Sequence, residues 1–247
     1  MNIPKYIHCN KCDEHGFIIN NGIATRCDCW TAYKSRVQFL QKLYESNLIT
    51  DITPQEKIDK FLDYDICSYK GDDVNKNIKK VKMFVSEFDT KFKTINLYIY
   101  GDNGTQKSTV VKWICKKLLK SGKSVYYIIG KDLIDIIMDS ERNEESKFKV
   151  TQMLQSDLLV IEEFEKSKLS LFSSNYKQSE LIPFLKTRME SICKSTIFIS
   201  NSEISDLYEL SETIGDLVDR ETMNCKLHFT DRYYANVKLD TSNLWDD

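Results

Sequence analysis

The chain has 247 residues, of which 41% are hydrophobic and 29% are charged, and its formal net charge is −2. This length and composition predict a globular protein with a sizeable core, organised as one main domain plus a small appendage. They exclude an integral membrane protein, since no apolar run approaches the roughly 20 residues of a membrane-spanning helix. The N-terminus lacks the apolar core of a signal peptide, so we expect a cytoplasmic protein.

Charge is divided unevenly along the chain. Residues 70–131 contain 14 Lys and 5 acidic residues, whereas residues 132–247 contain 13 basic and 23 acidic residues. The basic segment indicates an anionic partner, either a nucleotide or a nucleic acid, and the acidic segment indicates a basic protein surface. Solvated helix faces explain the pattern equally well, and the lysines between residues 112 and 123 partly fit that second interpretation.

Four cysteines lie within the first 30 residues, at Cys9, Cys12, Cys27 and Cys29. Clustered thiols in a reducing compartment indicate a metal site, and a Cys-x2-Cys knuckle can hold two thiolates at one tetrahedral ion. The intervening GFIINNGIATR has the pattern of a hairpin. The sequence therefore predicts a zinc ribbon with four Cys ligands, which is unfolded without metal. His8 and His15 are reserve ligands or, more simply, surface residues.

Two amphipathic helices are predicted on either side of a connector. Residues 31–49 and residues 74–92 both carry apolar side chains at helical spacing. The segment between them contains one Pro and one Gly. We therefore divide the chain into a zinc-binding, helical domain over residues 1–50, a linker over residues 51–65 and a second domain over residues 66–247.

A strand, a Gly-containing turn and a helix then follow in the order that a phosphate-binding loop requires. After the strand INLYIY, Lys107 is placed to reach the β- and γ-phosphates of a nucleotide, and Ser108 to place its hydroxyl on Mg²⁺. Gln106 stands where this motif has its last glycine. A Gly-containing turn before an ordinary amphipathic helix is the alternative interpretation. The expected nucleotide-binding residues of the loop are Gly101, Asn103, Gly104, Thr105, Gln106, Lys107, Ser108 and Thr109.

Two apolar strands further along the chain end on polar residues. The run LLVI is typical of a central parallel strand and ends on Glu162 and Glu163. We expect Glu162 to orient Mg²⁺ and its water shell, and Glu163 to polarise the attacking water. The strand TIFIS is followed by Asn201, which is either a sensor of the γ-phosphate or the cap of the next helix. A further strand, SVYYII, follows the loop helix.

Together, the CNKC…CDC ribbon, YIYGDNGTQKST, DLLVIEEFE, TIFISN and DLVDRETMNCKLHF resemble the DnaC/DnaI family of AAA+ helicase loaders, particularly those encoded by bacteriophages. The resemblance runs from about residue 6 to residue 234. It implies an α/β fold, with an AAA+ P-loop ATPase domain built on a central parallel sheet and preceded by a small N-terminal zinc-ribbon and helical domain. Transposition helper ATPases of the IstB type share the AAA+ half but do not usually carry the ribbon.

The resemblance also implies roles for individual residues. Lys107 and Ser108 match the Walker A contacts, Glu162 and Glu163 match the Walker B acids, and Asn201 matches sensor 1. Arg220 matches the arginine finger that such ATPases extend into a neighbouring subunit, which implies self-association. An Asp-Arg pair alone is usually a surface ion pair. Arg188 matches another arginine of the family, and Arg232 is either a nucleotide contact or part of a strand-end ion pair.

The family further implies partners and cofactors. Residues 1–50 are expected to hold a DnaB-type replicative helicase, while the ATPase domain binds ATP and Mg²⁺ and assembles on single-stranded DNA. Residues 70–131 are expected to contribute to a DNA groove, with Tyr126 and Tyr127 as stacking platforms or, more simply, as core residues. Gln106 and Glu162 depart from the family pattern and imply slow hydrolysis that acts as a switch. The alternatives are an IstB-like transposition helper and an adaptor without significant turnover.

Overall fold

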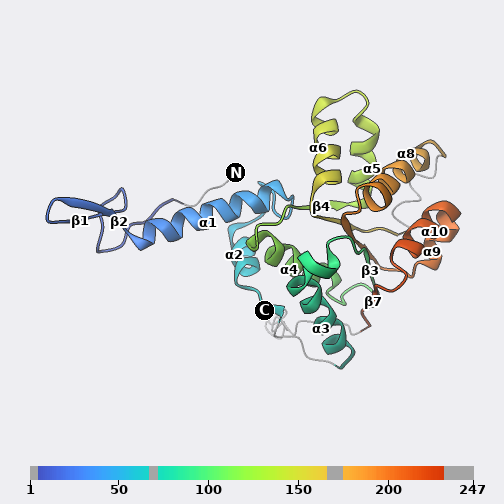
Figure 1. Cartoon of the computed structure of the whole chain (residues 1–247), viewed down its shortest axis with the longest axis horizontal. Helices are drawn as coiled ribbons and strands as arrows, with labels where there is room; N and C mark the ends of the chain where they lie inside the picture. The colour runs from blue at the N-terminus through green and yellow to red at the C-terminus, as the bar shows by residue number, and fades with distance from the viewer. Residues whose placement is uncertain (1–4, 67–71, 166–174, 231–247) are drawn as a thin grey trace, which may run out of the picture.

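The computed structural model describes residues 5–66, 72–165 and 175–230. In these ranges a hairpin and a long helix form an arm that projects from an α/β body (Figure 1). None of the helices in these three ranges is both long and apolar enough to cross a membrane.

The arm begins with a two-stranded antiparallel hairpin. Strands β1 (Phe17–Asn20) and β2 (Ile23–Arg26) are joined by Asn21 and Gly22, which both have positive φ, the conformation that a tight hairpin turn requires. No residue of either strand is buried, so the hairpin has no hydrophobic core of its own. Helix α1 (Asp28–Glu45) follows directly and connects the hairpin to the body.

The body is built on a five-stranded sheet in the order β4-β5-β6-β3-β7, in which every pair of neighbours is parallel. This arrangement confirms the predicted α/β fold with a central parallel sheet. The strands are buried almost throughout, because helices cover both faces of the sheet. The strands are β3 (Leu97–Tyr100), β4 (Val125–Ile129), β5 (Leu158–Glu162), β6 (Ser195–Ser200) and β7 (Lys226–His228).

Alternate side chains of strands β3, β4, β5 and β6 enter two separate cores. On β3, for example, Ile99 belongs to the first core and Tyr98 to the second. The first core is covered by the end of α1, α2 (Gln55–Asp63), α3 (Asp72–Ser86), the π-helix η2 (Phe88–Phe92) and α4 (Lys107–Lys120). The second is covered by α5 (Gly130–Asp139), α6 (Glu144–Gln155), α8 (Asn175–Lys186), the π-helix η4 (Thr187–Ser191), α9 (Ser205–Leu210) and α10 (Glu212–Glu221).

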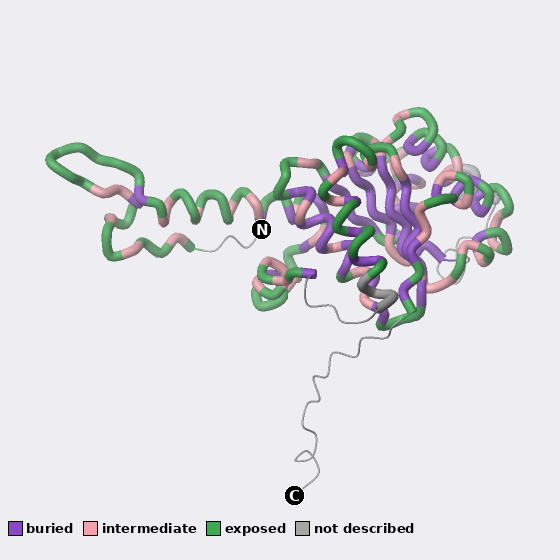
Figure 2. Tube along the Cα trace, turned by 60° about the horizontal axis from the view of Figure 1, so that its bottom comes forward, coloured by how far each residue is buried: buried purple, intermediate pink, exposed green. Residues whose placement is uncertain are grey.

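The body begins inside α1. Figure 2 shows only exposed and intermediate residues along the first turns of this helix, whereas its last turns bury Leu40 and Leu43, which belong to the first core. The segment expected as a linker contains α2, whose Ile58 is buried in that same core. Residues 40–66 therefore pack with the sheet and α4.

Polar contacts at both of its ends attach this segment to the body. The backbone N–H of Tyr127 donates to the carbonyl of Ser46 at 2.8 Å, which covers the outer edge of β4. The ammonium of Lys116 donates to the carbonyls of Phe61 (2.8 Å) and Leu62 (3.1 Å) at the end of α2. Burial lowers the pKa of Lys116, which is only 2% exposed. Lys116 is thus a helix cap, and the solvated-face interpretation is wrong for this lysine.

Candidate nucleotide site and cysteine cluster

The phosphate-loop candidate lies at the carboxyl end of β3, between that strand and the N-terminus of α4. Gly101 has φ +140°, and a Cβ at this position would lie 2.0 Å from the carbonyl oxygen of Phe229. Gly104 has φ +83°. Both positions therefore require glycine, the first for close backbone approach and the second for its backbone conformation.

Gln106 shows why a glycine is usual at the last position of this motif. Its backbone is left-handed, with φ 62° and ψ 21°, and it immediately precedes the first residue of α4. That conformation costs a residue with a side chain roughly 1–2 kcal/mol. The loop therefore keeps the backbone shape of a glycine at Gln106, at the expense of local strain.

Lys107 connects the loop to the end of β6. Its ammonium donates to the carbonyls of Gly101 (2.6 Å) and Asp102 (2.8 Å) and to Oδ1 of Asn201 (3.1 Å). Burial lowers the pKa of Lys107, whereas the nearby negative charge of Glu165 acts in the opposite direction. The lysine is therefore held by oxygen atoms at the position where the sequence predicts a phosphate contact.

The two predicted magnesium groups are in direct contact. The Ser108 hydroxyl donates to one carboxylate oxygen of Glu162, and the Tyr127 hydroxyl donates to the other. Hydroxyl and carboxylate oxygens are the ligand types that Mg²⁺ takes in nucleotide sites, so this pair fits the metal. The contact from Tyr127 was not predicted, because the sequence does not show that β4 and β5 are neighbours. Burial, followed by the charge of Glu162, raises the pKa of Tyr127.

Burial excludes a DNA-stacking role for both tyrosines of β4. Tyr126 is 7% exposed and Tyr127 is 5% exposed, so neither ring offers a face to a base. The simpler interpretation, that they are core residues, is confirmed, because each faces one of the two cores.

Glu163 and Asn201 follow two adjacent strands, β5 and β6. Glu163 has φ +57°, a strained conformation of the kind that concentrates at functional sites. Asn201 does not cap the next helix, because α9 begins at Ser205 and has no side-chain cap. Instead, the Asn201 side chain lies between Lys107 and the buried carboxylate of Glu165.

The two predicted arginines have different surroundings. The side chain of Arg220 is 52% exposed on α10 and forms ion pairs with Glu190, Asp216 (3.3 Å) and Glu221 (3.5 Å). Within one chain, Arg220 therefore forms the surface ion pairs that an Asp-Arg pair alone would suggest. Its role as an arginine finger in a neighbouring subunit stays a prediction. Arg232 lies outside the described residues.

Arg188 is fully buried at the opposite edge of the sheet. Its guanidinium donates to the carbonyls of Met153 (2.6 Å), Ser156 (3.1 Å) and Ser195 (2.6 Å), which lie just before or at the start of β5 and β6. Arg188 therefore joins the amino ends of two strands and takes no part in the nucleotide site.

The four N-terminal cysteines converge, with all four sulfurs within 4.8 Å of one another. Four bonds of about 2.3 Å to a tetrahedral zinc would place the sulfurs roughly 3.8 Å apart. Four of the sulfur pairs approach that spacing: Cys27 with Cys29 at 3.3 Å, Cys12 with Cys29 at 3.4 Å, Cys9 with Cys27 at 3.6 Å and Cys9 with Cys12 at 3.7 Å. The cluster thus fits zinc.

An aromatic side chain supports the cluster. The hydroxyl of Tyr6 lies 3.1 Å from the sulfur of Cys29, and hydrogen bonds to this sulfur, that of Tyr6 foremost, lower the pKa of Cys29 to about 6. The Tyr6 ring also packs edge-on against Trp30, with ring centroids 4.8 Å apart. Both expected reserve ligands, His8 and His15, are exposed and stand outside the cluster. Tyr6 was missed because a lone tyrosine before a knuckle carries no pattern.

Comparison with known proteins places this geometry in a family. The chain is 27% identical over 136 residues to the replicative helicase loader DnaC of Escherichia coli (strain K12), a match that covers 54% of the chain and 52% of DnaC. The chain thus spans about half the length of the curated relatives it matches.

Two solved structures share the fold. DnaI has a TM-score of 0.54 at 18% identity, covering 73% of this chain and 93% of that one. The replication initiator DnaA bound to AMPPCP and single-stranded DNA has a TM-score of 0.52 at 17% identity, covering 65% and 47%. At these identities the likeness shows the fold alone.

A family model described as "ATPase family associated with various cellular activities (AAA)" matches residues 97–221. That range runs from β3 to the end of α10, and so includes the phosphate loop, both strand-end acids and Asn201. Since the match spans half of the chain, the protein belongs to the AAA family of ATPases.

Proposed function

We propose that the chain is an ATP-binding helicase loader that delivers a DnaB-type replicative helicase to single-stranded DNA. The observation that carries the proposal is the convergence of Lys107, Ser108, Glu162 and Asn201 at one edge of the sheet in a member of the AAA family. The likeness to a protein named as a replicative helicase loader supports this function over other AAA activities. Origin from a bacteriophage stays a prediction.

The residues divide the work at the nucleotide site. ATP with Mg²⁺ supplies the γ-phosphoryl group whose transfer to water provides the switch. Lys107 and the loop N–H groups bind phosphate, while Ser108 and Glu162 hold the metal. Glu163 accepts the proton of the attacking water, and Arg220 adds positive charge from a neighbouring chain.

Five hydrogen bonds within the chain favour slow turnover. Lys107 is bound by loop carbonyls and by Asn201, and Glu162 is bound by Ser108 and Tyr127. These groups must exchange partners before they hold phosphate and metal. We therefore propose weak ATPase activity suited to timing.

The decisive test of the nucleotide site is titration with a fluorescent ATP analogue. Lys107→Ala should reduce affinity at least tenfold, because a charge-assisted contact contributes about 1.5–3 kcal/mol. Lys120→Ala is the matched control, since this exposed lysine lies at the other end of α4. If neither wild type nor Lys107→Ala binds nucleotide, the adaptor without turnover becomes the function.

We propose that the cysteine cluster holds zinc and that the arm it stabilises binds the helicase. The hairpin lies at the far end of α1, and Ile19 (67%) and Ile23 (68%) are exposed beside its turn (Figure 1). The strand register places these two side chains on opposite faces of the hairpin, so each face offers an apolar group to a partner that encloses the tip of the arm.

Capture of a DnaB-type helicase tests the role of the arm. The double variant Ile19→Ser with Ile23→Ser should lose capture, while Ile52→Ser, which alters an isoleucine that is 90% exposed elsewhere, should keep it. Deletion of residues 1–27 should have the same effect as the double variant. It leaves Leu40 and Leu43 in the core, which a deletion of residues 1–50 would remove. Unchanged capture after deletion of residues 1–27 removes the assignment.

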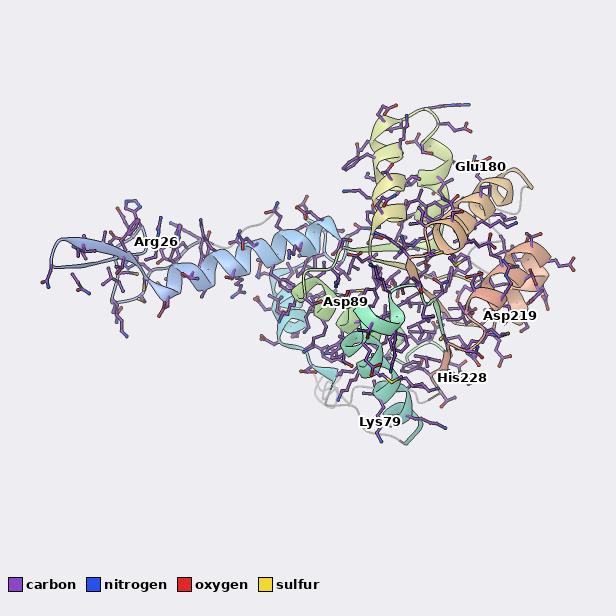
Figure 3. All side chains as sticks on the ribbon, viewed as in Figure 1. Arg26, Lys79, Asp89, Glu180, Asp219 and His228 are labelled. Carbon is purple, nitrogen blue, oxygen red and sulfur yellow. The ribbon has the colours of Figure 1, made fainter. Side chains whose placement is uncertain are left out.

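For DNA we propose α3 as a contact surface. Lys76, Lys79, Lys80 and Lys82 are all exposed on this helix, and Lys79 lies on its outer side (Figure 3). Neutralising two of them, Lys79→Ala with Lys80→Ala, should weaken single-stranded DNA binding and reduce its salt dependence. A preference for duplex over single-stranded DNA would instead favour the IstB-like transposition helper.

A further inference from the structure

Glu165 is a buried acid beside the nucleotide site and lies outside the phosphate loop and the strand-end acid pair. It lies three residues beyond the end of β5 and is only 4% exposed. Its carboxylate accepts two hydrogen bonds from Asn201, one from the backbone N–H at 2.7 Å and one from Nδ2 of the side chain at 3.2 Å. A buried carboxylate is costly unless such donors stabilise it.

The chemistry of the two neighbours fixes the orientation of the Asn201 amide. A carboxylate only accepts hydrogen bonds, so the NH₂ group must face Glu165. An ammonium only donates, so Oδ1 must face Lys107, to which it is bonded at 3.1 Å. If the amide oxygen and nitrogen were exchanged, the NH₂ group would face the Lys107 ammonium, donor against donor. The oxygen would face the Glu165 carboxylate, acceptor against acceptor.

We propose that Glu165 is a positioning residue, which holds Asn201 so that a hydrogen-bond acceptor faces the nucleotide site. This inference rests on the proposed ATP site and refines the part that Asn201 plays there. An oxygen can accept from the attacking water, and it repels a phosphate oxygen. Asn201 would therefore orient water and would not donate a hydrogen bond to the γ-phosphate.

The same geometry implies that Glu165 lowers the affinity for nucleotide while it favours hydrolysis. Glu165 places a negative charge close to Lys107, the residue proposed to bind phosphate. Its charge therefore weakens nucleotide binding, while its hydrogen bonds favour hydrolysis. A residue that only supported the fold would not shift these two quantities in opposite senses.

Glu165→Gln separates the two effects with little change in shape. The glutamine oxygen retains the shorter bond to the backbone N–H of Asn201, so its own NH₂ faces the Asn201 side chain. When Lys107 leaves Asn201 to bind phosphate, Asn201 then turns its amide and presents NH₂ to the site. We expect kcat for ATP hydrolysis to fall about tenfold, while ATP binds severalfold more tightly.

Glu203→Gln is the matched control, because it removes an exposed acid two residues from Asn201. It should leave both quantities near wild type. If Glu165→Gln changes kcat and affinity no more than Glu203→Gln does, or lowers both kcat and affinity, the proposal is overturned.

A second measurement needs neither nucleotide nor turnover. In the nucleotide-free wild type, the side-chain NH₂ signals of Asn201 in NMR, assigned by their loss in Asn201→Asp, should exchange slowly with water. They should stay slow in Lys107→Ala and become fast in Glu165→Gln. Fast exchange in wild type contradicts the proposed orientation. If wild type fails to bind ATP, the proposed function fails, but these signals still decide the role of Glu165.

Discussion

At the scale of single residues, the strain at Gln106 gives the most direct prediction. Gln106→Gly removes a left-handed backbone cost of roughly 1–2 kcal/mol and adds about 0.5–1 kcal/mol of unfolded-state entropy. We therefore expect the free energy of unfolding to rise by up to about 1 kcal/mol, with ATP affinity unchanged or higher. Urea denaturation and nucleotide titration measure the two quantities.

Gln106→Ala is the control for this substitution. Alanine also removes the side chain, but it keeps the left-handed strain, so it should not stabilise the protein. A loss of ATP binding in Gln106→Gly would show that the glutamine side chain is itself a nucleotide contact.

Residue types and spacing were sufficient to predict part of the site. The loop lysine, the acids after β5 and the asparagine after β6 were expected at one sheet edge, because parallel strands direct their carboxyl ends to the same side. Tyr127 and Glu165 could not be found in this way. Each acts through a residue from another strand, and no pattern in a single sequence shows that pairing.

At the scale of elements, Lys116 is the clearest case of tertiary contact overriding sequence pattern. The segment containing α2 reads as a polar connector, yet the ammonium of Lys116 caps the carbonyls at its end, including that of Tyr64. Lys116→Met should make the amides of residues 55–66 exchange faster with solvent, at a cost of about 2–3 kcal/mol, because buried carbonyls lose their donors.

Lys120→Met, which alters an exposed lysine of the same helix, should leave this exchange unchanged. Equal exchange of residues 55–66 in both variants would mean that apolar packing, including that of Ile58 and Ile66, and the contact of Trp113 with Asp65 are sufficient to hold the segment.

The hairpin depends on the cysteine cluster in a comparable way. It has no buried strand residue, so zinc is expected to supply the free energy that folds it, which is of order 10 kcal/mol for structural sites. Removal of zinc by a chelator should change the fluorescence of Trp30, which packs on Tyr6 beside Cys29. ATP binding should survive, because the hairpin contributes nothing to either core.

Zinc content provides the control for the cluster. Cys29→Ser should lose the metal, whereas Cys193→Ser, which alters an exposed thiol outside the cluster, should keep one zinc per chain. Equal zinc content in the two variants would contradict the site.

At the scale of the whole molecule, the sequence predicted the order of the parts better than their boundaries. Hairpin, helix and ATPase body follow one another as expected, but the core of the body includes Leu40, Leu43 and Ile58. These residues lie before the expected start of the second domain. A helix that is half exposed and half buried has no composition shift at the point where it enters the core. That point therefore becomes visible only in the packing.

The proposed self-association of the chain can be tested by mixing two inactive variants. Each ATP site is proposed to need Lys107 from its own chain and Arg220 from a neighbour. The variants Lys107→Ala and Arg220→Ala should each abolish hydrolysis alone. An equimolar mixture should regain roughly one quarter of the wild-type rate on single-stranded DNA, because random assembly pairs an intact lysine with an intact arginine at that frequency.

Lys226→Ala is the control. It removes another cation that is paired with an acid of α10, and it should hydrolyse ATP normally. Full ATPase activity of Arg220→Ala alone would show that this arginine forms only surface ion pairs with Glu190 and Asp216 and takes no part in hydrolysis.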